Sequence, residues 1–181
     1  PRHTKSEFAS FLFPAWMMGK NPKMKIIQAT HTTELAVNFG RKTKNLIDSD
    51  DYKDIFPEVR LAADSKASGR WDTASGGMYY AVGVGSNLAG RGGDLVIIDD
   101  PHSEQTAMSA NGFDDAWEWY TGGPRQRLQP GGSIVLVQTR WSEKDMTGQL
   151  LRAMAKDPLA DQWEIVELPA IFEDDTPCWP E

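Results

Sequence analysis

Two adjacent carboxylates, Asp99 and Asp100, follow a continuous apolar run at residues 95–98. A run of this kind, with glycine before it and Pro101 after it, is typical of a strand buried on both faces of a parallel sheet. Because open α/β sheets bind ligands at the carboxyl ends of their strands, an acidic pair there can hold a hydrated Mg²⁺ and polarise a water molecule. Asp-Asp-Pro is also ordinary turn chemistry, so the pair alone leaves a purely structural turn open.

Lys5 and Ser6 stand where a helix is expected to begin, and they match the last two positions of the phosphate-binding pattern G-x-x-x-x-G-K-[ST]. In that pattern backbone N–H groups cradle phosphate oxygens, the lysine neutralises charge and the hydroxyl binds Mg²⁺. Thr4 replaces the second glycine, which costs stability if the backbone needs a positive φ there. Taken alone, the pair favours a solvated lysine in a first helical turn.

A third polar pair, Thr139 and Arg140, follows another apolar stretch at residues 133–138. If all three segments meet at one edge of one sheet, they supply a phosphate cradle, a site for metal and water, and a polar sensor of the γ-phosphate. A hydrolytic NTPase needs this set of groups. The combination of the three segments is therefore more specific than any one of them.

The elements that must position these side chains alternate between strand and helix patterns. We expect strands at 24–30, 78–84, 95–98, 133–138 and 163–168, with 70–73 pairing against 78–84 in a hairpin. We expect helices at 33–47, 113–128 and 143–155, and a further helix that begins at Lys5 and that Pro14 breaks, kinks or restarts. The expected N-caps are Thr32 or Thr33 and Ser142. This alternation predicts a three-layer α/β domain with a mainly parallel sheet.

The composition bounds the class of protein. A chain of 181 residues with 40% hydrophobic and 25% charged residues suits one globular domain. No apolar run reaches membrane-spanning length, no signal peptide is visible, and the single Cys178 fits a reducing compartment. Because the net charge is −7, any contact with nucleic acid must be local, transient or made by parts not present. Both ends look cut, so we expect a fragment of a longer chain.

Together, these segments resemble the ATPase domain of the large terminase subunit of tailed bacteriophages, the motor that packages DNA into the capsid. The resemblance rests on residues 1–7, 90–101 and 138–145, and it extends over nearly the whole chain, to Ala170. It implies a P-loop NTPase-type domain of the ASCE class whose first strand is missing from the fragment. It also implies an ATPase domain at residues 1–170 and a linker at 171–181 toward an absent nuclease domain.

The resemblance implies roles for the residues of the variant phosphate loop. Lys5 would bind phosphate, and Ser6 would provide the hydroxyl linked to Mg²⁺. His3 and Thr4 would complete the nucleotide-binding loop, and Arg2 matches a basic position that could touch the γ-phosphate.

It implies further roles at the two strand ends. Asp99 matches the Mg²⁺-directing residue of the Walker B strand, and Asp100 stands where many members carry a glutamate that orients the attacking water. Asp100 is one methylene shorter than glutamate, so Glu104 is an alternative for that role. Thr139 and Arg140 match the coupling motif, which senses the nucleotide and relays its state to DNA movement.

Two other departures concern an arginine and a histidine of the family. Ala89 stands where many relatives carry an arginine that is proposed to act on a neighbouring subunit's ATP. Arg91 is the nearest candidate for that action, although a role in positioning its own loop is at least as plausible. Ser142 replaces a histidine often seen after Thr-Arg-Trp.

The resemblance also implies the cofactors and partners. These are ATP and Mg²⁺, double-stranded viral DNA, the portal protein, the small terminase subunit and further copies in a ring, with no membrane. The location would be the host cytoplasm, transiently at the procapsid portal. Because the family's adenine-recognition segment and nuclease domain are absent from these 181 residues, we expect weak or no ATPase activity from them alone.

Three alternatives stay open from the residues themselves. They are a helicase-like P-loop NTPase, a degenerate nucleotide-binding module used for assembly, and a metal-dependent nuclease that uses Asp99 and Asp100.

Most of the seven tryptophans indicate core or interface anchors, with base stacking by Trp71 or Trp141 less expected. His31 and His102 lack the spacing of a metal site and suggest capping or surface hydrogen bonds.

Overall fold

The computed structural model of the chain describes residues 4–65, 67–169, 171–172 and 175–178. Their contacts form two compact units, Pro1–Gln149 and Leu150–Glu181. The first unit holds a five-stranded sheet, and the second holds the end of the last helix and an irregular tail. The domain boundary expected at residue 170 stays a prediction.

The sheet has the strand order β2-β3-β1-β4-β5. The strands are β1 (Lys25–Thr30), β2 (Arg70–Asp72), β3 (Met78–Gly83), β4 (Gly93–Asp99) and β5 (Leu128–Val137). Strands β3, β1, β4 and β5 run parallel, and β2 runs antiparallel to β3. This topology confirms the predicted α/β fold with a mainly parallel sheet, and it confirms the hairpin.

The register aligns the carboxyl ends of three strands at one edge of the sheet. Asp99 pairs with Thr30 of β1 on one side and with Val137 of β5 on the other. Strands β1 and β4 are buried along nearly their whole length, as continuous apolar runs predict for central parallel strands. The segments that follow β1, β4 and β5 are therefore brought next to one another.

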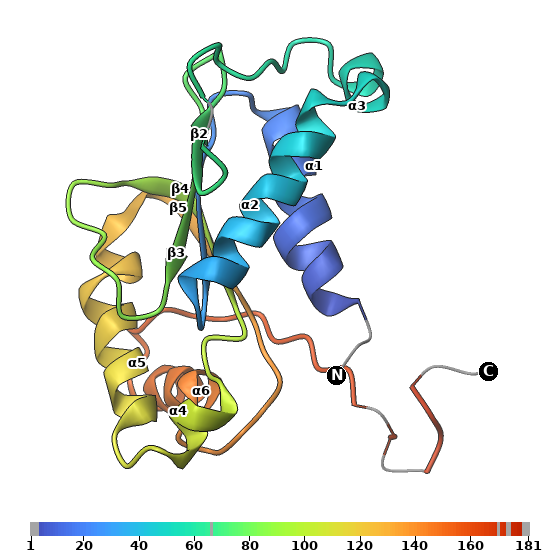
Figure 1. Cartoon of the computed structure of the whole chain (residues 1–181). Coiled ribbons are helices and arrows are strands. Elements are labelled where there is room, and N and C mark those ends of the chain that lie inside the picture. Colours follow the sequence, from blue (N-terminus) through green and yellow to red (C-terminus); the bar gives the residue numbers. More distant parts are fainter. Residues whose placement is uncertain (1–3, 66, 170, 173–174, 179–181) are drawn as a thin grey trace. The chain divides into compact units, whose positions relative to one another are not determined.

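Helices cover both faces of the sheet, with α1 and α2 on one face and α5 on the other (Figure 1). The helical elements are η1 (Glu7–Leu12, a π-helix), α1 (Phe13–Lys20), α2 (Thr33–Asp48), α3 (Asp50–Ile55), α4 (Glu104–Met108), α5 (Gly112–Gly122), η2 (Pro124–Arg127, a 3₁₀-helix) and α6 (Met146–Lys156). Thr32 caps α2 as predicted, because its side chain accepts a hydrogen bond from Leu35 N–H. None of the described helices has the length and apolar character needed to cross a membrane.

The first helix changes type next to Pro14, where the prediction placed a break, a kink or a restart. It runs as η1 followed directly by α1, and the Phe13 N–H donates to the carbonyl of Phe8, five residues back. Proline lacks an N–H and clashes with the carbonyl of residue i−4 in an α-helix. The wider π turn before Pro14 separates it from that carbonyl, so the helix continues.

Trp71 lies in the core, so it does not stack on a base or an adenine. Its ring stacks on Tyr79 with 4.9 Å between the centroids, and its Nε1–H donates to the carbonyl of Gly40. The side chain is fully buried. The hairpin of β2 and β3 is therefore fastened to α2 by the largest side chain of the core.

Three predicted elements differ from the structure on the C-terminal side of β4. Helix α5 ends at Gly122 instead of residue 128, because Gly123 and Pro124 cannot continue it. Helix α6 begins at Met146 instead of residue 143, since Asp145 and not Ser142 accepts the hydrogen bond of Gly148 N–H. The strand predicted at 163–168 is irregular, with no partner strand among the described residues to accept its backbone hydrogen bonds.

Candidate functional site

The candidate site lies where the strand order reverses. Strand β1 leads through α2 to β3 on one side of the sheet, whereas β4 leads to β5 on the other side. In open α/β sheets the crevice between two such strands, at their carboxyl ends, is the usual ligand-binding position. Here that crevice is flanked by His31, which follows β1, and by Asp99 and Asp100 at the end of β4.

Asp99 is a buried carboxylate that is only partly satisfied. Its side chain is 2% exposed, and its Oδ2 accepts a hydrogen bond from Ser10 Oγ at 2.8 Å. Its Oδ1 has no hydrogen-bond partner in the described part of the chain and faces Lys5 Nζ at 3.6 Å. Buried carboxylate oxygens are normally hydrogen-bonded, so this oxygen relies on its ion pair with Lys5 and can still accept a further donor or a cation.

Asp100 joins the three predicted segments. Lys5 Nζ lies 2.6 Å from Asp100 Oδ2, and Thr139 N–H donates to Asp100 Oδ1 at 3.0 Å. The backbone N–H of His31 donates to the carbonyl of Asp100. The structure therefore brings Lys5, Asp99, Asp100 and Thr139 together at the rim of the sheet.

The backbone is strained at two positions of this cluster. Thr4, directly before Lys5, has φ +61°, and Asp100 has φ +43°. Residues other than glycine rarely adopt positive φ, and a β-branched threonine is especially disfavoured there. Such strain gathers at functional sites because the surrounding contacts hold the chain in an otherwise costly conformation.

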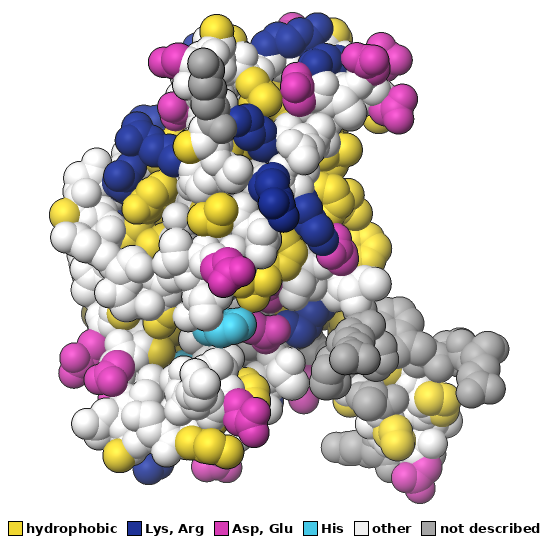
Figure 2. Space-filling model, viewed as in Figure 1, with side chains coloured by type: hydrophobic (Ala, Val, Ile, Leu, Met, Phe, Trp, Pro, Cys, Tyr) yellow, Lys and Arg dark blue, Asp and Glu magenta, His cyan; other side chains and the backbone are white. Residues whose placement is uncertain are grey.

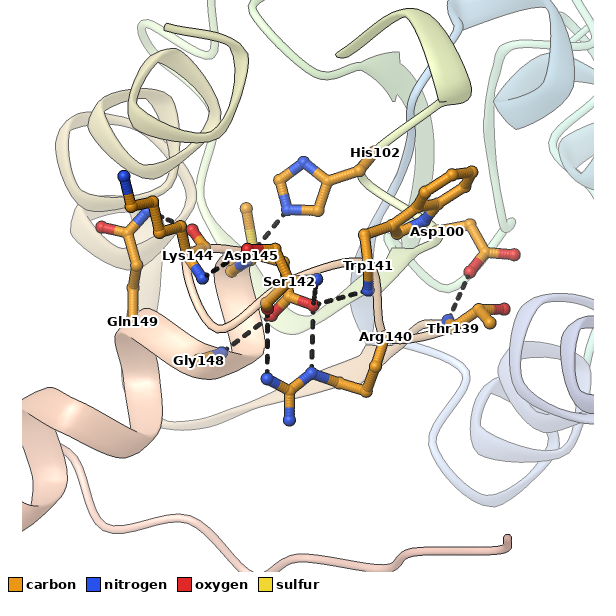
Figure 3. A network of polar contacts seen from close by, with 11 residues as sticks. Asp100, His102, Thr139, Arg140, Trp141, Ser142, Lys144, Asp145, Gly148 and Gln149 are labelled. Carbon is orange, nitrogen blue, oxygen red and sulfur yellow. Dashed lines mark hydrogen bonds and ion pairs between the residues drawn. The ribbon is translucent and has the colours of Figure 1, made fainter. Parts of the chain in front are cut away.

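Arg140 lies beside Thr139 but turns away from Asp100 (Figure 3). Its Nε donates to Asp145 Oδ2 at 3.0 Å, and its Nη2 donates to the carbonyl of Ser142. The group of this segment that reaches the carboxylates is therefore the backbone N–H of Thr139.

Glu104 and Arg91 lie outside the cluster. Glu104 begins the short helix α4 and lines a cleft of about 720 Å³ with His31 and Asp115. Figure 2 shows a histidine side chain exposed in a hollow near the middle of the visible face. Arg91 stacks on the ring of Tyr80 at 4.0 Å and precedes β4, whose far end carries Asp99. This cation–π contact would hold the loop before β4 in place, as the predicted loop-positioning role of Arg91 requires.

Arg2 and His3 lie outside the described residues. Ser6 precedes η1, but the hydroxyl that binds Asp99 belongs to Ser10, one turn further along the helix. Gln28 Nε2 in turn donates to Ser10 Oγ at 3.1 Å. Ser10 and Gln28 were not predicted, although a glutamine in the middle of a buried strand is a signal that could have found them.

Comparison with known proteins gives a similarity to a solved structure. No family model matches the sequence, and no curated protein matches it. Among solved structures, the chain is similar to the HK97 bacteriophage large terminase. The TM-score is 0.44 and the identity 14%, over 75% of this chain and 27% of that one. This chain spans about a quarter of the length of that terminase.

Asp99 and Asp100 are side chains of the kind that bind Mg²⁺ in proteins. Within the described residues no group of three or more His, Cys, Asp or Glu side chains could hold a metal ion by itself. Mg²⁺ usually takes one or two carboxylates and fills its other positions with water and substrate phosphate. The Oδ1 of Asp99, which has no hydrogen-bond donor among the described residues, is a ligand of the required kind and lies beside Lys5.

Two buried titratable groups lie behind the cluster. Burial lowers the pKa of His102 below its ordinary value of 6.5, although the nearby Asp145 carboxylate opposes the shift. Burial alone would raise the pKa of Asp145, but hydrogen bonds from Gly148, Trp141, Arg140 and Ser142 outweigh it and hold the pKa below 3.8. His102 is therefore neutral and Asp145 charged near pH 7.

Proposed function

We propose that the rim formed by β1, β4 and β5 is the Mg-ATP site of an ATPase to which this chain contributes. The observation that carries the proposal is the convergence of Lys5, the two carboxylates and the Thr139 N–H, which come from three segments far apart in the sequence. Such a set supplies a cation for phosphate, ligands for a metal and a base for water, which phosphoryl transfer to water requires.

Each residue of the cluster then has a part in the reaction. Lys5 exchanges Asp100 for the β- and γ-phosphate oxygens and neutralises their charge. Asp99 would hold Mg²⁺ through Oδ1, which lacks a hydrogen-bond donor among the described residues, and a bound Mg²⁺ would supply charge stabilisation for the phosphates. Asp100, freed from Lys5 and still held by Thr139 N–H, accepts a hydrogen bond from the attacking water and orients it.

We further propose that hydrolysis moves double-stranded DNA into a viral capsid. This part is supported by the resemblance of residues 1–7, 90–101 and 138–145 to the large terminase motor. The portal protein, the small terminase subunit and a ring of further copies are the corresponding partners, in the host cytoplasm. Arg91 or another arginine would complete a neighbouring subunit's site, and Glu104 would be the second candidate for orienting water.

A nucleotide-binding module without turnover is the second candidate. It is favoured by Thr4, which keeps a strained φ of +61° where the phosphate-binding pattern has glycine. It is also favoured by the short side chain of Asp100, which is already engaged by two donors.

The test is Mg-ATP binding and hydrolysis by the full-length gene product. Lys5→Ala and Asp99→Asn should each reduce turnover at least about a hundredfold, as expected when a charge-stabilising group is lost. Lys20→Ala, at the exposed end of α1, is the matched control and should leave turnover unchanged. Tight Mg-ATP binding without turnover would support the assembly module instead. DNA cleavage that needs Asp99 but not Lys5 would indicate a nuclease.

A further inference from the structure

Asp145 is a fully buried carboxylate enclosed by donors from its own loop (Figure 3). Its Oδ2 accepts from Arg140 Nε at 3.0 Å, Trp141 N–H at 2.9 Å and Ser142 N–H at 3.2 Å. Its Oδ1 accepts from Gly148 N–H at 2.9 Å. Because Asp145 accepts four hydrogen bonds, three of them from backbone N–H groups, it holds the backbone of residues 141–148 in one conformation.

The same loop is tied to the segment after β4 at both of its ends. At one end Thr139 N–H donates to Asp100 Oδ1, and at the other Met146 N–H donates to His102 Nε2 at 2.9 Å. His102 is 3% exposed, and its ring packs edge-on against Phe113. Two points of attachment, only two residues apart on the β4 side, prevent the loop from swinging about either one.

Close backbone packing adds a steric constraint. A Cβ atom placed on Gly148 would lie 2.0 Å from the carbonyl oxygen of Glu143. Any side chain there would push residues 143–145 away from the first turn of α6. Glycine has no Cβ atom, so Gly148 allows the loop to pack closely against α6, the helix that Asp145 caps.

We propose that Asp145 and His102 form a clamp that holds Thr139 N–H on Asp100, and that Arg140 acts through Asp145 without touching the nucleotide. The consequence for turnover rests on the proposed ATP hydrolysis, whereas the clamp itself does not. Arg140 is then a positioning residue, because its guanidinium neutralises the buried Asp145 charge. The part of the motif that responds to the nucleotide is the Thr139 backbone.

The first experiment tests the clamp without activity, by hydrogen exchange on the full chain. Asp145→Asn should speed exchange of the amides at 139–142 and of the Asp100 and His102 amides by about tenfold, since hydrogen bonds to a charged group are lost. Asp114→Asn, an exposed carboxylate in the first turn of α5, is the matched control. Unchanged exchange of the Asp100 and His102 amides in a folded Asp145→Asn variant would overturn the clamp.

If Asp145→Asn fails to fold, substitutions of His102 test the clamp instead. His102→Gln places an amide oxygen near the position of Nε2 and should keep exchange at 139–146 close to wild type. His102→Leu removes the acceptor for Met146 N–H and should speed exchange there. Equal protection in both variants would contradict a role for the His102 acceptor.

The second experiment separates positioning from nucleotide contact by steady-state kinetics. Arg140→Gln should lower kcat about tenfold with little change in KM for ATP, and it should add no further loss to Asp145→Asn. A large rise in KM, or full additivity with Asp145→Asn, would show that Arg140 contacts the nucleotide. If the wild type has no turnover that depends on Lys5, the ATPase proposal fails while the exchange experiment still decides the clamp.

Discussion

At the scale of single residues, the site is marked by strain and by an incomplete hydrogen-bond set. Thr4 and Asp100 both have positive φ, and Asp99 Oδ1 is buried without a hydrogen-bond donor among the described residues. Each feature costs free energy in the folded state, and each lies within the same small cluster. A bound phosphate with its metal ion would supply a partner for the Asp99 carboxylate. Ligand binding would therefore offset the free-energy cost of these two features.

Thr4→Gly should stabilise the folded chain by about 1 kcal/mol, because glycine adopts the left-handed region without a clash at Cβ. Urea unfolding of the full chain measures the change. Thr4→Ala is the control, since alanine keeps a Cβ atom and should not bring this gain. Equal stability of the glycine and alanine variants would show that the positive φ is not a source of strain.

At the scale of elements, one loop connects the end of β5 to α6 and is fastened to the end of β4. The buried charge of Asp145 and the neutral ring of His102 are both part of this connection. Their pKa values are both lowered, so protonation of either group opposes folding. Acid is therefore expected to weaken this connection.

The free energy of unfolding should decrease as pH falls from 7 to 5. Because the pKa of folded His102 lies below the unfolded value of 6.5, its contribution is full above pH 6.5 and is lost as pH falls toward the folded pKa. Asp145 adds a second loss only below about pH 4, its ordinary pKa being 3.8. Chemical denaturation at several pH values measures the slope, and His102→Gln should flatten it between pH 7 and 5. An unchanged slope in that variant would assign the effect to other groups.

At the scale of the whole molecule, β5 forms an edge of the sheet. In the described part of the chain it bonds to β4 alone, and its apolar residues 134–137 are only partly buried. An apolar edge strand presents unpaired N–H and C=O groups and promotes pairing with other chains.

We expect this chain to associate as its concentration rises and Ser133→Lys to reduce the association. Ser133 lies at an exposed position of β5, where an added charge discourages edge pairing without removing core contacts. Ser109→Lys changes the net charge equally at an exposed position outside the sheet and serves as the control. Light scattering against concentration measures the difference. Equal association of the two variants would show that β5 is not the contact.

The sequence by itself determined most of the local elements and placed Asp99 and Asp100 where a buried strand ends. Apolar runs and turn residues marked β1, β3, β4 and β5, and Thr32 marked the start of α2. These features depend on neighbours a few residues away, so periodicity and capping chemistry reveal them. The strand predicted at 163–168 failed because an apolar run becomes a strand only beside a partner strand.

Only the tertiary structure decided which side chains meet. Lys5 reaches Asp100 across 95 residues of sequence, Ser10 reaches Asp99 across 89, and Met146 reaches His102 across 44. The parallel register sets these distances by aligning the ends of β1, β4 and β5, and no local pattern encodes that register. The contact of Ser10 with Asp99 therefore became visible only in the folded chain.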